Sequence, residues 1–581
     1  MAAYTATQSG NWSDAATWGG SGPPGDGDTA TVGAFTVTVD VDTTVGTSPN
    51  DTTTNVVNKS SATGSLIVGA GVTFTVKGNI GGVNTSVFTM QPGSAVVFDA
   101  SASGGTPTYR FNNGGFQAFD FNGSSGSRCA VRAITGRYCS LNVAVTSITA
   151  TFTDFLRCST LINVTSGDVT FADCTFDDCG RLSLSNSGTT VSCTVARNAF
   201  SNGQHANDDV VLTYSGTFTS GTRLFERNVL SKALTYNSVL FTCQNNYLGG
   251  GVDGVAGSYY RRFSGNLVYG TRANGQVVQS AATSRNCFLA PSTGSGNPHF
   301  VEAKASSADV AFDQNVFESN APDVVDMGDC ILIVGTGISA GRKVVARNNV
   351  VVPNSAAASA VSSGTMLTAF SAGADTVTEW YRNSCNINNF QTTGKRGAFA
   401  TSEGGDGPAG QVAALKSNVV YGSSSGQGYL GERTAGTLQD GITAAGADYN
   451  WLHNTSAGSD GRGYQATNTG NTMWAAGNAA AAGVDDNQGS GDPQFVDATR
   501  NTRTWAVDRG YGTTTADALT ALQADPTRTA DLIDYVFAGF KPSNAAMRTA
   551  AHDGMCVGAA NYHDVTRTGV GISKVRAFLA A

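Results

Sequence analysis

Charged side chains are scarce in this chain, and their scarcity argues against some classes of function. Only 13% of the 581 residues are Asp, Glu, Lys or Arg, which is about half the share usual in globular proteins. The net charge is −8, and no cluster of five or more Lys or Arg occurs. Binding to nucleic acid is therefore not expected, because it depends on many cationic contacts to phosphate.

Targeting and membrane-spanning segments are also missing from the sequence. The first residues, 1–8, contain neither the basic nor the apolar part of a secretory signal. No run of 18 apolar residues exists. We therefore expect a protein that folds in a cytoplasm and does not insert into a membrane.

Motifs for metals and cofactors are absent as well. The five His residues show no HxH or HExxH spacing, and the eleven Cys form no CxxC pair, so neither a metal site nor a cofactor is expected. The cysteines allow two interpretations. They are either small buried residues in a reducing compartment or disulfides between repeats, for example through Cys174 and Cys179.

Gly, Thr, Ser, Asn and Val are abundant instead. There are 72 Gly residues, well above the usual share of about 7%. Apolar and polar residues alternate over 35–42 and 72–77, and a shorter apolar run covers 95–98. This composition and this period of two predict short strands joined by tight turns.

One short phrase repeats along the chain: a residue that is usually polar, then Asn, then two mostly apolar residues. The steps between clear copies are 30, 18, 20, 20, 29, 34, 69 and 32 residues, and a degenerate copy at Asn383 divides the longest step. Such periods predict stacked repeats, here the coils of a mainly β solenoid, a parallel β-helix. The nine clear copies contain Asn198, Asn228, Asn246, Asn266, Asn286, Asn315, Asn349, Asn418 and Asn450.

We expect the repeated Asn residues to form a structural ladder at the corners of the coils. Asn tolerates a left-handed backbone, and stacked amides can hydrogen-bond from one coil to the next. Asp154 and Asp173 are expected to be Asp versions of the same corner. A binding role for the Asn residues is the alternative.

Three regions follow from these patterns. Residues 1–30 are expected to be an entry segment in which Trp12 and Trp18 cover the open end of the solenoid. Residues 31–500 form the β-helix, with loop insertions after about 290. Residues 501–581 form a capping or docking region, with helices predicted over 516–524 and 529–540 and another after Pro542.

The two ends of the sequence resemble a known type of protein. Residues 9–40, SGNWSDAATWGGSGPPGDGDTATVGAFTVTVD, resemble the start of right-handed parallel β-helix proteins of bacterial and phage surfaces. Residues 491–512 and 538–554 resemble the end of β-helix proteins encoded among bacteriophage structural genes. The resemblance implies a virion component, such as a tail spike, fibre or capsid-surface spike, that is commonly trimeric.

The best candidate for contact with a sugar is the sequence Glu379-Trp380-Tyr381-Arg382. Aromatic rings stack on sugar rings, while Glu and Arg bind hydroxyl groups; packing of Trp380 and Tyr381 inside a coil is the alternative. Catalytic residues cannot be assigned. There are only six Glu among 43 acidic residues, and no pair of carboxylates of the kind that cleaves glycans can be chosen from sequence alone.

Three functions remain open. The favoured one is a non-enzymatic structural protein of a bacteriophage virion that contacts host surface polysaccharide. The alternative is a tail-spike depolymerase that cleaves capsule or lipopolysaccharide, either as a glycoside hydrolase or as a polysaccharide lyase. A bacterial adhesin is the third. The favoured function predicts a homotrimer on the virion surface, assembled in the host cytoplasm with other capsid, neck or tail proteins.

Overall fold

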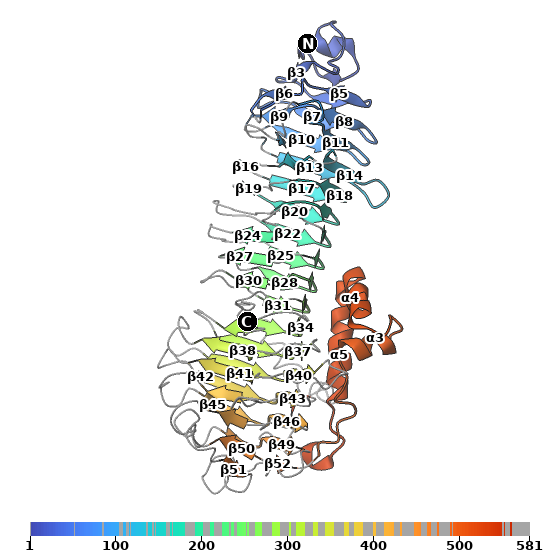
Figure 1. Cartoon of the computed structure of the whole chain (residues 1–581). Helices are drawn as coiled ribbons and strands as arrows, with labels where there is room; N and C mark the ends of the chain where they lie inside the picture. Colours follow the sequence, from blue (N-terminus) through green and yellow to red (C-terminus); the bar gives the residue numbers. More distant parts are fainter. Residues whose placement is uncertain are drawn as a thin grey trace, which may run out of the picture. The chain divides into compact units, whose positions relative to one another are not determined.

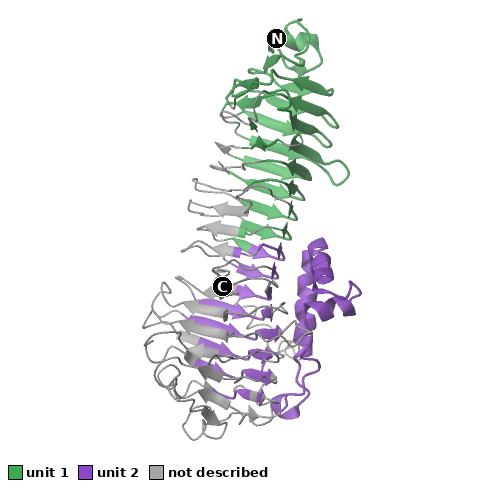
Figure 2. Ribbon diagram, in the orientation of Figure 1, with its two compact units in different colours: residues 1–242 green, residues 243–581 purple. Residues whose placement is uncertain are grey.

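The computed structural model contains two compact units, residues 1–242 and residues 243–581 (Figure 2). Each unit is described by itself below. The first part of the chain is described over residues 2–180, apart from 52, 84–85, 104–107, 112–115, 117, 135–136, 142–143, 146, 159–162 and 165–166. The remaining described segments are 192–201, 210–213, 223–231, 234–237, 241–250, 252–254, 262–269, 282–290, 301–303, 309–319, 329–334, 343–353, 365–370, 377–386, 399–401, 412–422, 430–432, 447–454, 462–465, 473–475, 489–490, 492–548, 551 and 558–559.

Both units are built from coils whose strands pair in parallel with the equivalent strands of neighbouring coils (Figure 1). Each regular coil has a strand in sheet 1, a corner of two residues, and a strand in sheet 2. Cys193–Ala196, Arg197-Asn198 and Ala199–Ser201 form one such coil. The prediction of a mainly β parallel β-helix is therefore confirmed.

In unit 1 the coils begin at the N-terminus. Sheet 1 contains β2 (Gly10–Asn11), β4 (Val37–Val39), β7 (Ser65–Val68), β10 (Val87–Met90), β13 (Ala118–Asn122), β17 (Ser147–Thr151), β20 (Val169–Ala172), β22 (Cys193–Ala196) and β25 (Arg223–Glu226). Sheet 2 contains β5 (Thr43–Val45), β8 (Thr73–Val76), β11 (Ala95–Phe98), β14 (Cys129–Ala133), β18 (Thr153–Leu156), β21 (Thr175–Asp177), β23 (Ala199–Ser201) and β26 (Val229–Leu230). The other strands are β1 (Ala3–Thr5), β3 (Thr29–Thr31), β6 (Asn55–Lys59), β9 (Asn79–Gly82), β12 (Tyr109–Arg110), β15 (Cys139–Ser140), β16 (Ala144–Val145), β19 (Asn163–Val164), β24 (Val210–Thr213) and β27 (Leu234–Asn237).

The N-terminal segment is part of the stack. Strand β1 pairs in parallel with β3, and β2 pairs in parallel with β4, so stacking begins within residues 1–30. Trp12 and Trp18 are buried, and their rings meet edge to face at 4.9 Å. Trp12 also contacts Phe74 at 5.3 Å. The two indoles therefore cover the interior side chains of the first coils.

Unit 2 has the same two-sheet pattern. Sheet 1 contains β28 (Thr242–Gln244), whose first residue belongs to unit 1, β31 (Arg262–Ser264), β33 (Ala282–Ser284), β36 (Val310–Asp313), β39 (Lys343–Arg347), β42 (Val377–Tyr381), β45 (Val412–Lys416) and β48 (Ala447–Asp448). Sheet 2 contains β29 (Tyr247–Leu248), β32 (Leu267–Tyr269), β34 (Cys287–Ala290), β37 (Val316–Ser319), β40 (Val350–Pro353), β43 (Ser384–Asn386), β46 (Val419–Gly422), β49 (Trp451–Asn454) and β52 (Gly489–Ser490). The other strands are β30 (Val252–Gly254), β35 (Val301–Ala303), β38 (Asp329–Val334), β41 (Thr365–Phe370), β44 (Phe399–Thr401), β47 (Leu430–Glu432), β50 (Arg462–Gln465) and β51 (Met473–Ala475).

The corner between the two sheets differs from the prediction in one respect. The left-handed residue is the one before the Asn: φ is 56° at Arg197, 53° at Arg285 and 52° at Arg382. Gly265 takes the same place in another coil, with φ of 68°. The expectation that Asn itself supplies the left-handed backbone is therefore wrong. The turn comes one residue earlier, so that the following side chain points into the coil.

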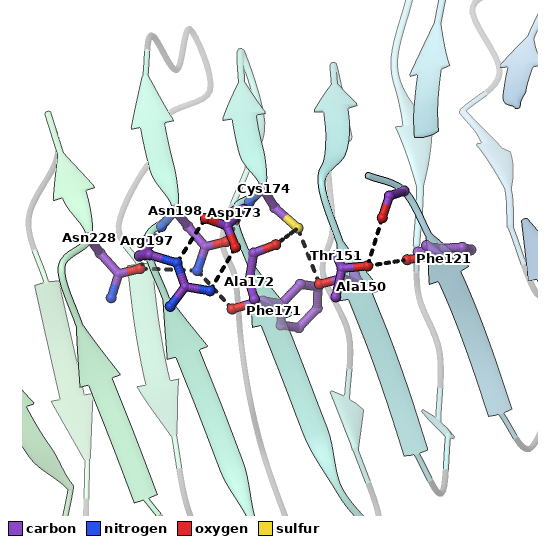
Figure 3. A network of polar contacts seen from close by, with 11 residues as sticks. Phe121, Ala150, Thr151, Phe171, Ala172, Asp173, Cys174, Arg197, Asn198 and Asn228 are labelled. Atoms are coloured by element: carbon purple, nitrogen blue, oxygen red, sulfur yellow. Dashed lines mark hydrogen bonds and ion pairs between the residues drawn. The ribbon is translucent and has the colours of Figure 1, made fainter. Parts of the chain in front are cut away.

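The Asn side chains form the predicted ladder inside the coils (Figure 3). In unit 1, Asn198 Nδ2 donates to Asn228 Oδ1 at 3.0 Å and to Phe171 O at 3.0 Å. In unit 2 the same amide-to-amide bond joins successive members from Asn246 to Asn450, and Asn383 fills the degenerate copy. All of these Asn residues are fully or almost fully buried, so their role in the structure is to satisfy interior backbone and amide groups.

Within unit 1 the ladder includes other residue types. Cys174 stands in register with Asn198, and its thiol donates to Ala150 O at 3.4 Å, as the Asn198 amide does to Phe171 O (Figure 3). Thr153 holds the same place one coil earlier. The prediction is confirmed for Asp173 as a left-handed corner residue, although the ladder member there is Cys174, and it is wrong for Asp154, which lies within β18. Asp173 is the left-handed residue before Cys174, and Asp154 follows Thr153 on the outer face.

The helical element of unit 2 lies along the outer face of sheet 2 (Figure 1). It comprises α3 (Thr502–Asp508), α4 (Thr515–Ala524), η2 (Pro526–Arg528), α5 (Thr529–Gly539) and η3 (Ala545–Arg548), and one further 3-10 turn, η1 (Ala15–Trp18), belongs to unit 1. The predicted face of Leu532, Tyr535, Val536 and Phe540 is buried. Helix α3 lies outside the ranges predicted to be helical, and the segment after Pro542 forms only a short 3-10 turn in its described part.

The two units differ on the outer face of sheet 2. Leu289, Glu318 and Val352 share one register column in unit 2, and all three are fully buried. The helical element covers this column: the Thr502 N–H at the start of α3 donates to Glu318 Oε2 at 2.9 Å, and Arg285 pairs with Asp534 of α5 at 2.7 Å. In unit 1 the matching column of Leu156, Asp177 and Ser201 is only partly buried or exposed.

Candidate functional site

The four residues proposed to contact sugar do not act together. Strand β42 alternates, so Glu379 and Tyr381 lie on the outer face of sheet 1 while Trp380 is 0% exposed inside the coil. Arg382 is the left-handed corner residue before Asn383. The expectation that Trp380 offers its ring to a ligand is therefore wrong, because period-two alternation turns it into the interior.

Tyr381 belongs to a column of outward side chains that crosses five coils of unit 2. The parallel pairing places Asp313, Arg347, Tyr381, Lys416 and Asp448 in one register, and we call these five residues the polar column. All are partly exposed. At the usual strand spacing of about 4.8 Å the column is about 19 Å long. It places one aromatic ring between two cationic side chains, next to an outward column of Ala311, Val345, Glu379 and Ala414.

Ion pairs hold the charged members of this face in place. Arg347 Nη2 lies 3.1 Å from Asp313 Oδ2, and Asn348 Nδ2 donates to the other oxygen of that carboxylate at 3.0 Å. Lys343 Nζ lies 2.7 Å from Glu379 Oε1 on the neighbouring strand. Burial of the Tyr381 ring, with a smaller contribution from the negative charge of Glu379, raises the pKa of its hydroxyl. The phenol therefore stays neutral and able to donate a hydrogen bond at neutral pH.

Sequence reasoning found Tyr381 but missed the other members of the polar column. Each member lies two residues before a ladder Asn, as in Asp313-Gln314-Asn315 and Lys416-Ser417-Asn418. Aligning the copies of the repeat on their Asn would have brought these positions together. In the two coils before Asp313 the same position holds the small residues Ser264 and Ser284, so an unbroken run of larger side chains starts at Asp313.

The carboxylates of this face do not form a closely spaced pair. Asp313 and Glu379 lie two strands apart and two residues out of register, roughly 12 Å between their backbone positions by strand geometry. Glycosidases place their two carboxyl groups about 5–10 Å apart. Among the described residues, this face is therefore better suited to binding than to glycan cleavage.

Two acidic residues elsewhere have raised pKa values. Burial raises the pKa of Asp120, which lies on the outer face of sheet 1 in unit 1 between Thr89 and Thr149. Burial raises the pKa of Glu318 to about 7, although hydrogen bonds from Thr502 oppose the shift. Glu318 is covered by helix α3 and is a structural group, whereas Asp120 remains partly exposed.

The cysteines with described side chains are free and buried. Cys174 and Cys179 do not pair: the Cys174 thiol donates to Ala150 O and the Cys179 thiol donates to Phe155 O. No group of three His, Cys, Asp or Glu residues in the described part of the chain is placed to hold a metal ion. In the same part, no helix has both the length and the apolar character needed to cross a membrane.

Comparison with known proteins gives no relative. The chain matches no protein family, no curated protein and no solved structure.

Proposed function

We propose that this chain is a non-enzymatic structural protein of a bacteriophage virion, exposed on the particle as a spike, fibre or capsid decoration. The confirmed parallel β-helix is a scaffold whose polar outer face is built from many coils, and the sequence at both ends resembles virion β-helix proteins. The proposed assembly is a homotrimer in contact with other virion proteins.

The proposed contact with the host is a surface polysaccharide bound along the polar column. The observation that carries this proposal is that Arg347, Tyr381 and Lys416 lie in one register. The half-buried ring of Tyr381 therefore has a cationic side chain on each side. An aromatic face packs on a sugar ring, and charged side chains bind its hydroxyl or carboxylate groups. A linear polymer can follow such a column from coil to coil.

Binding to a panel of neutral and acidic bacterial surface polysaccharides tests this role. We expect at least one polymer to bind, and Tyr381→Ala to weaken that binding about tenfold through loss of ring contact. Thr170→Ala, on the outer face of sheet 1 in unit 1, is the matched control and should leave binding unchanged. Absence of binding to every polymer, or equal binding by both variants, would count against the polar column.

The depolymerase alternative has one observation in its favour, the raised pKa of Asp120, since a general acid must hold a proton at the working pH. The same panel is therefore assayed for new reducing ends and for new unsaturated ends. If the native chain releases reducing or unsaturated ends and the Asp120→Asn variant does not, the chain is a depolymerase and the non-enzymatic assignment is wrong.

Placement and assembly are tested separately. Immunogold labelling of purified phage particles should locate the chain on the particle surface, and sedimentation should give a mass three times the 59.5 kDa of one chain. A chain absent from particles contradicts the virion assignment even if polysaccharide binding is found.

A further inference from the structure

Three cysteines of unit 1 stack in successive coils. Cys139 and Cys158 are partners in a parallel β-bridge, and the N–H of Gly180 donates to Cys158 O, which places Cys179 in the next coil. All three side chains are buried. We call Cys139, Cys158 and Cys179 the thiol column.

The sulfur atoms of the thiol column are in direct contact. Cys139 Sγ lies 3.4 Å from Cys158 Sγ, and the Cys158 thiol also has a hydrogen-bond contact with Cys179. The other buried cysteines have different neighbours. Cys193, for example, stands in register with Val169 and Arg223, so it has no thiol beside it on either neighbouring strand.

The backbone around Cys139 and Cys158 already suits a disulfide. Bridge partners on adjacent parallel strands lie about 4.8 Å apart, and disulfide-bonded residues have Cα atoms roughly 4.4–6.8 Å apart. A bond of about 2.0 Å between the sulfurs, which now lie 3.4 Å apart, therefore requires rotation of both side chains and a small local approach of the two strands.

Burial protects these thiols in the closed coil. Contacts with Cys139 and Cys179, together with burial, raise the pKa of Cys158 well above its ordinary value. The thiolate is the form that attacks a disulfide, so reaction needs either an opened coil or a chain that is still folding. A reducing compartment keeps the three thiols free.

We propose that Cys139 and Cys158 are a disulfide site that closes when the folding or locally opened chain meets a low-molecular-weight disulfide, and that the bond clamps two successive coils together. One thiolate attacks the oxidant and releases one reduced thiol. The second cysteine then attacks the mixed disulfide and releases the other. Two cysteine thiols lose two electrons and two protons, and one oxidant disulfide becomes two thiols. This inference does not depend on the proposed virion role.

The test is refolding of the full chain in oxidised glutathione and, separately, in reduced glutathione. Free thiols are then alkylated under denaturing conditions and the protein is analysed by peptide mass spectrometry. The reduced chain should show all eleven alkylated cysteines, and the oxidised chain two fewer, with a linked peptide pair that contains Cys139 and Cys158. The oxidised form should also melt a few degrees higher.

Serine variants distinguish a disulfide within the thiol column from oxidation of cysteines elsewhere in the chain. Cys158→Ser removes the central thiol and should abolish the linked pair, whereas Cys179→Ser and the matched control Cys193→Ser should retain it. Circular dichroism verifies that each variant refolds. If Cys158→Ser misfolds, Cys139→Ser serves in its place, and the link should then move to Cys158 and Cys179. Complete alkylation of the natively refolded chain after oxidation overturns the proposal. So does an oxidised Cys158→Ser chain that still loses two free thiols, because that loss would come from other cysteines.

Discussion

At the scale of single residues, each coil of the Asn ladder has a corner that meets two requirements. One residue adopts a left-handed backbone, which costs a residue with a side chain about 1–2 kcal/mol. The next residue turns an amide into the interior, where it satisfies groups that water cannot reach. Arg197-Asn198 and Gln314-Asn315 divide these tasks in the same way.

The first prediction concerns the strained position. Arg227 has φ of 52° and an exposed side chain. Arg227→Gly should be neutral or raise the free energy of unfolding by up to about 1 kcal/mol, because Gly adopts this conformation freely. Arg227→Val should lower it by about 1–2 kcal/mol. Urea unfolding of both variants measures the difference, and the opposite order would contradict the assigned corner.

The second prediction concerns the amide. Asn315 accepts from the backbone N–H and the side-chain amide of Asn286 and donates to Asn349 Oδ1 and Thr283 O. Asn315→Ala leaves several of these buried groups without partners, so stability should fall by roughly 3 kcal/mol or more. The outer-face control Val345→Thr should change stability by less than about 0.5 kcal/mol. A loss for Asn315→Ala as small as that of the control would mean that the ladder contributes little.

At the scale of elements, the contact between helix α3 and strand β37 is the most unusual. Glu318 is fully buried, accepts from the Thr502 backbone N–H at 2.9 Å and 3.1 Å, and also accepts from the Thr502 hydroxyl. A carboxyl group therefore fixes the first turn of the helix against an apolar sheet face. The same face binds Met547 and Ala551, which cluster with Val419 and Trp451.

The third prediction is the pH dependence of this contact. The pKa of Glu318 in the folded chain, about 7, lies above its ordinary value of 4.5, so the folded chain holds the proton more tightly than the unfolded chain. This tighter binding adds up to about 3 kcal/mol to the free energy of unfolding. The contribution is fully present below about pH 4.5 and is lost as the pH rises through about 7.

Hydrogen-exchange protection factors of residues 502–540 at pH 5 and pH 8 measure this effect. Protection should be higher at pH 5, and Glu318→Gln should remove the difference because the amide does not titrate. Asp534→Asn, at the ion pair of the helical element with Arg285, is the control and should keep the difference. Equal protection of the native chain at both values would show that Glu318 does not titrate in this range.

At the scale of the whole molecule, stability should be local, because each coil of a solenoid contacts only its neighbours. The fourth prediction follows: Asn315→Ala should reduce exchange protection in β33, β36 and β39 and leave β10 and β11 unchanged. Hydrogen exchange followed by mass spectrometry compares the two regions in one sample. A uniform loss across both would indicate a single cooperative transition instead.

Much of the fold could be predicted from local patterns. The Asn phrase located the corners of the coils that use a buried amide, and the spacing of Leu532, Tyr535 and Val536 located helix α5. Helix α3 was missed because it has seven residues and no apolar repeat. The corner at Asp173 was predicted, but its ladder residue was not, because the Cys174 thiol replaces the amide.

The candidate site was harder to predict for a different reason. Asp313, Arg347 and Lys416 come from separate coils, and only the register between strands brings them beside Tyr381. The candidate residues 379–382 were neighbours in sequence, and strand alternation separated them. Residues that act together on a solenoid are one coil apart, so sequence adjacency is a poor guide to its surface.

The sequence by itself determined the repeating coil, since the spacing of Asn and of apolar residues reflects a local requirement that recurs from coil to coil. Only the tertiary structure decided which residue of each corner is left-handed, which strand face is covered by the helices, and which sulfurs touch. These depend on stacking between coils, where the partner of each residue lies some 20–35 positions away along the chain.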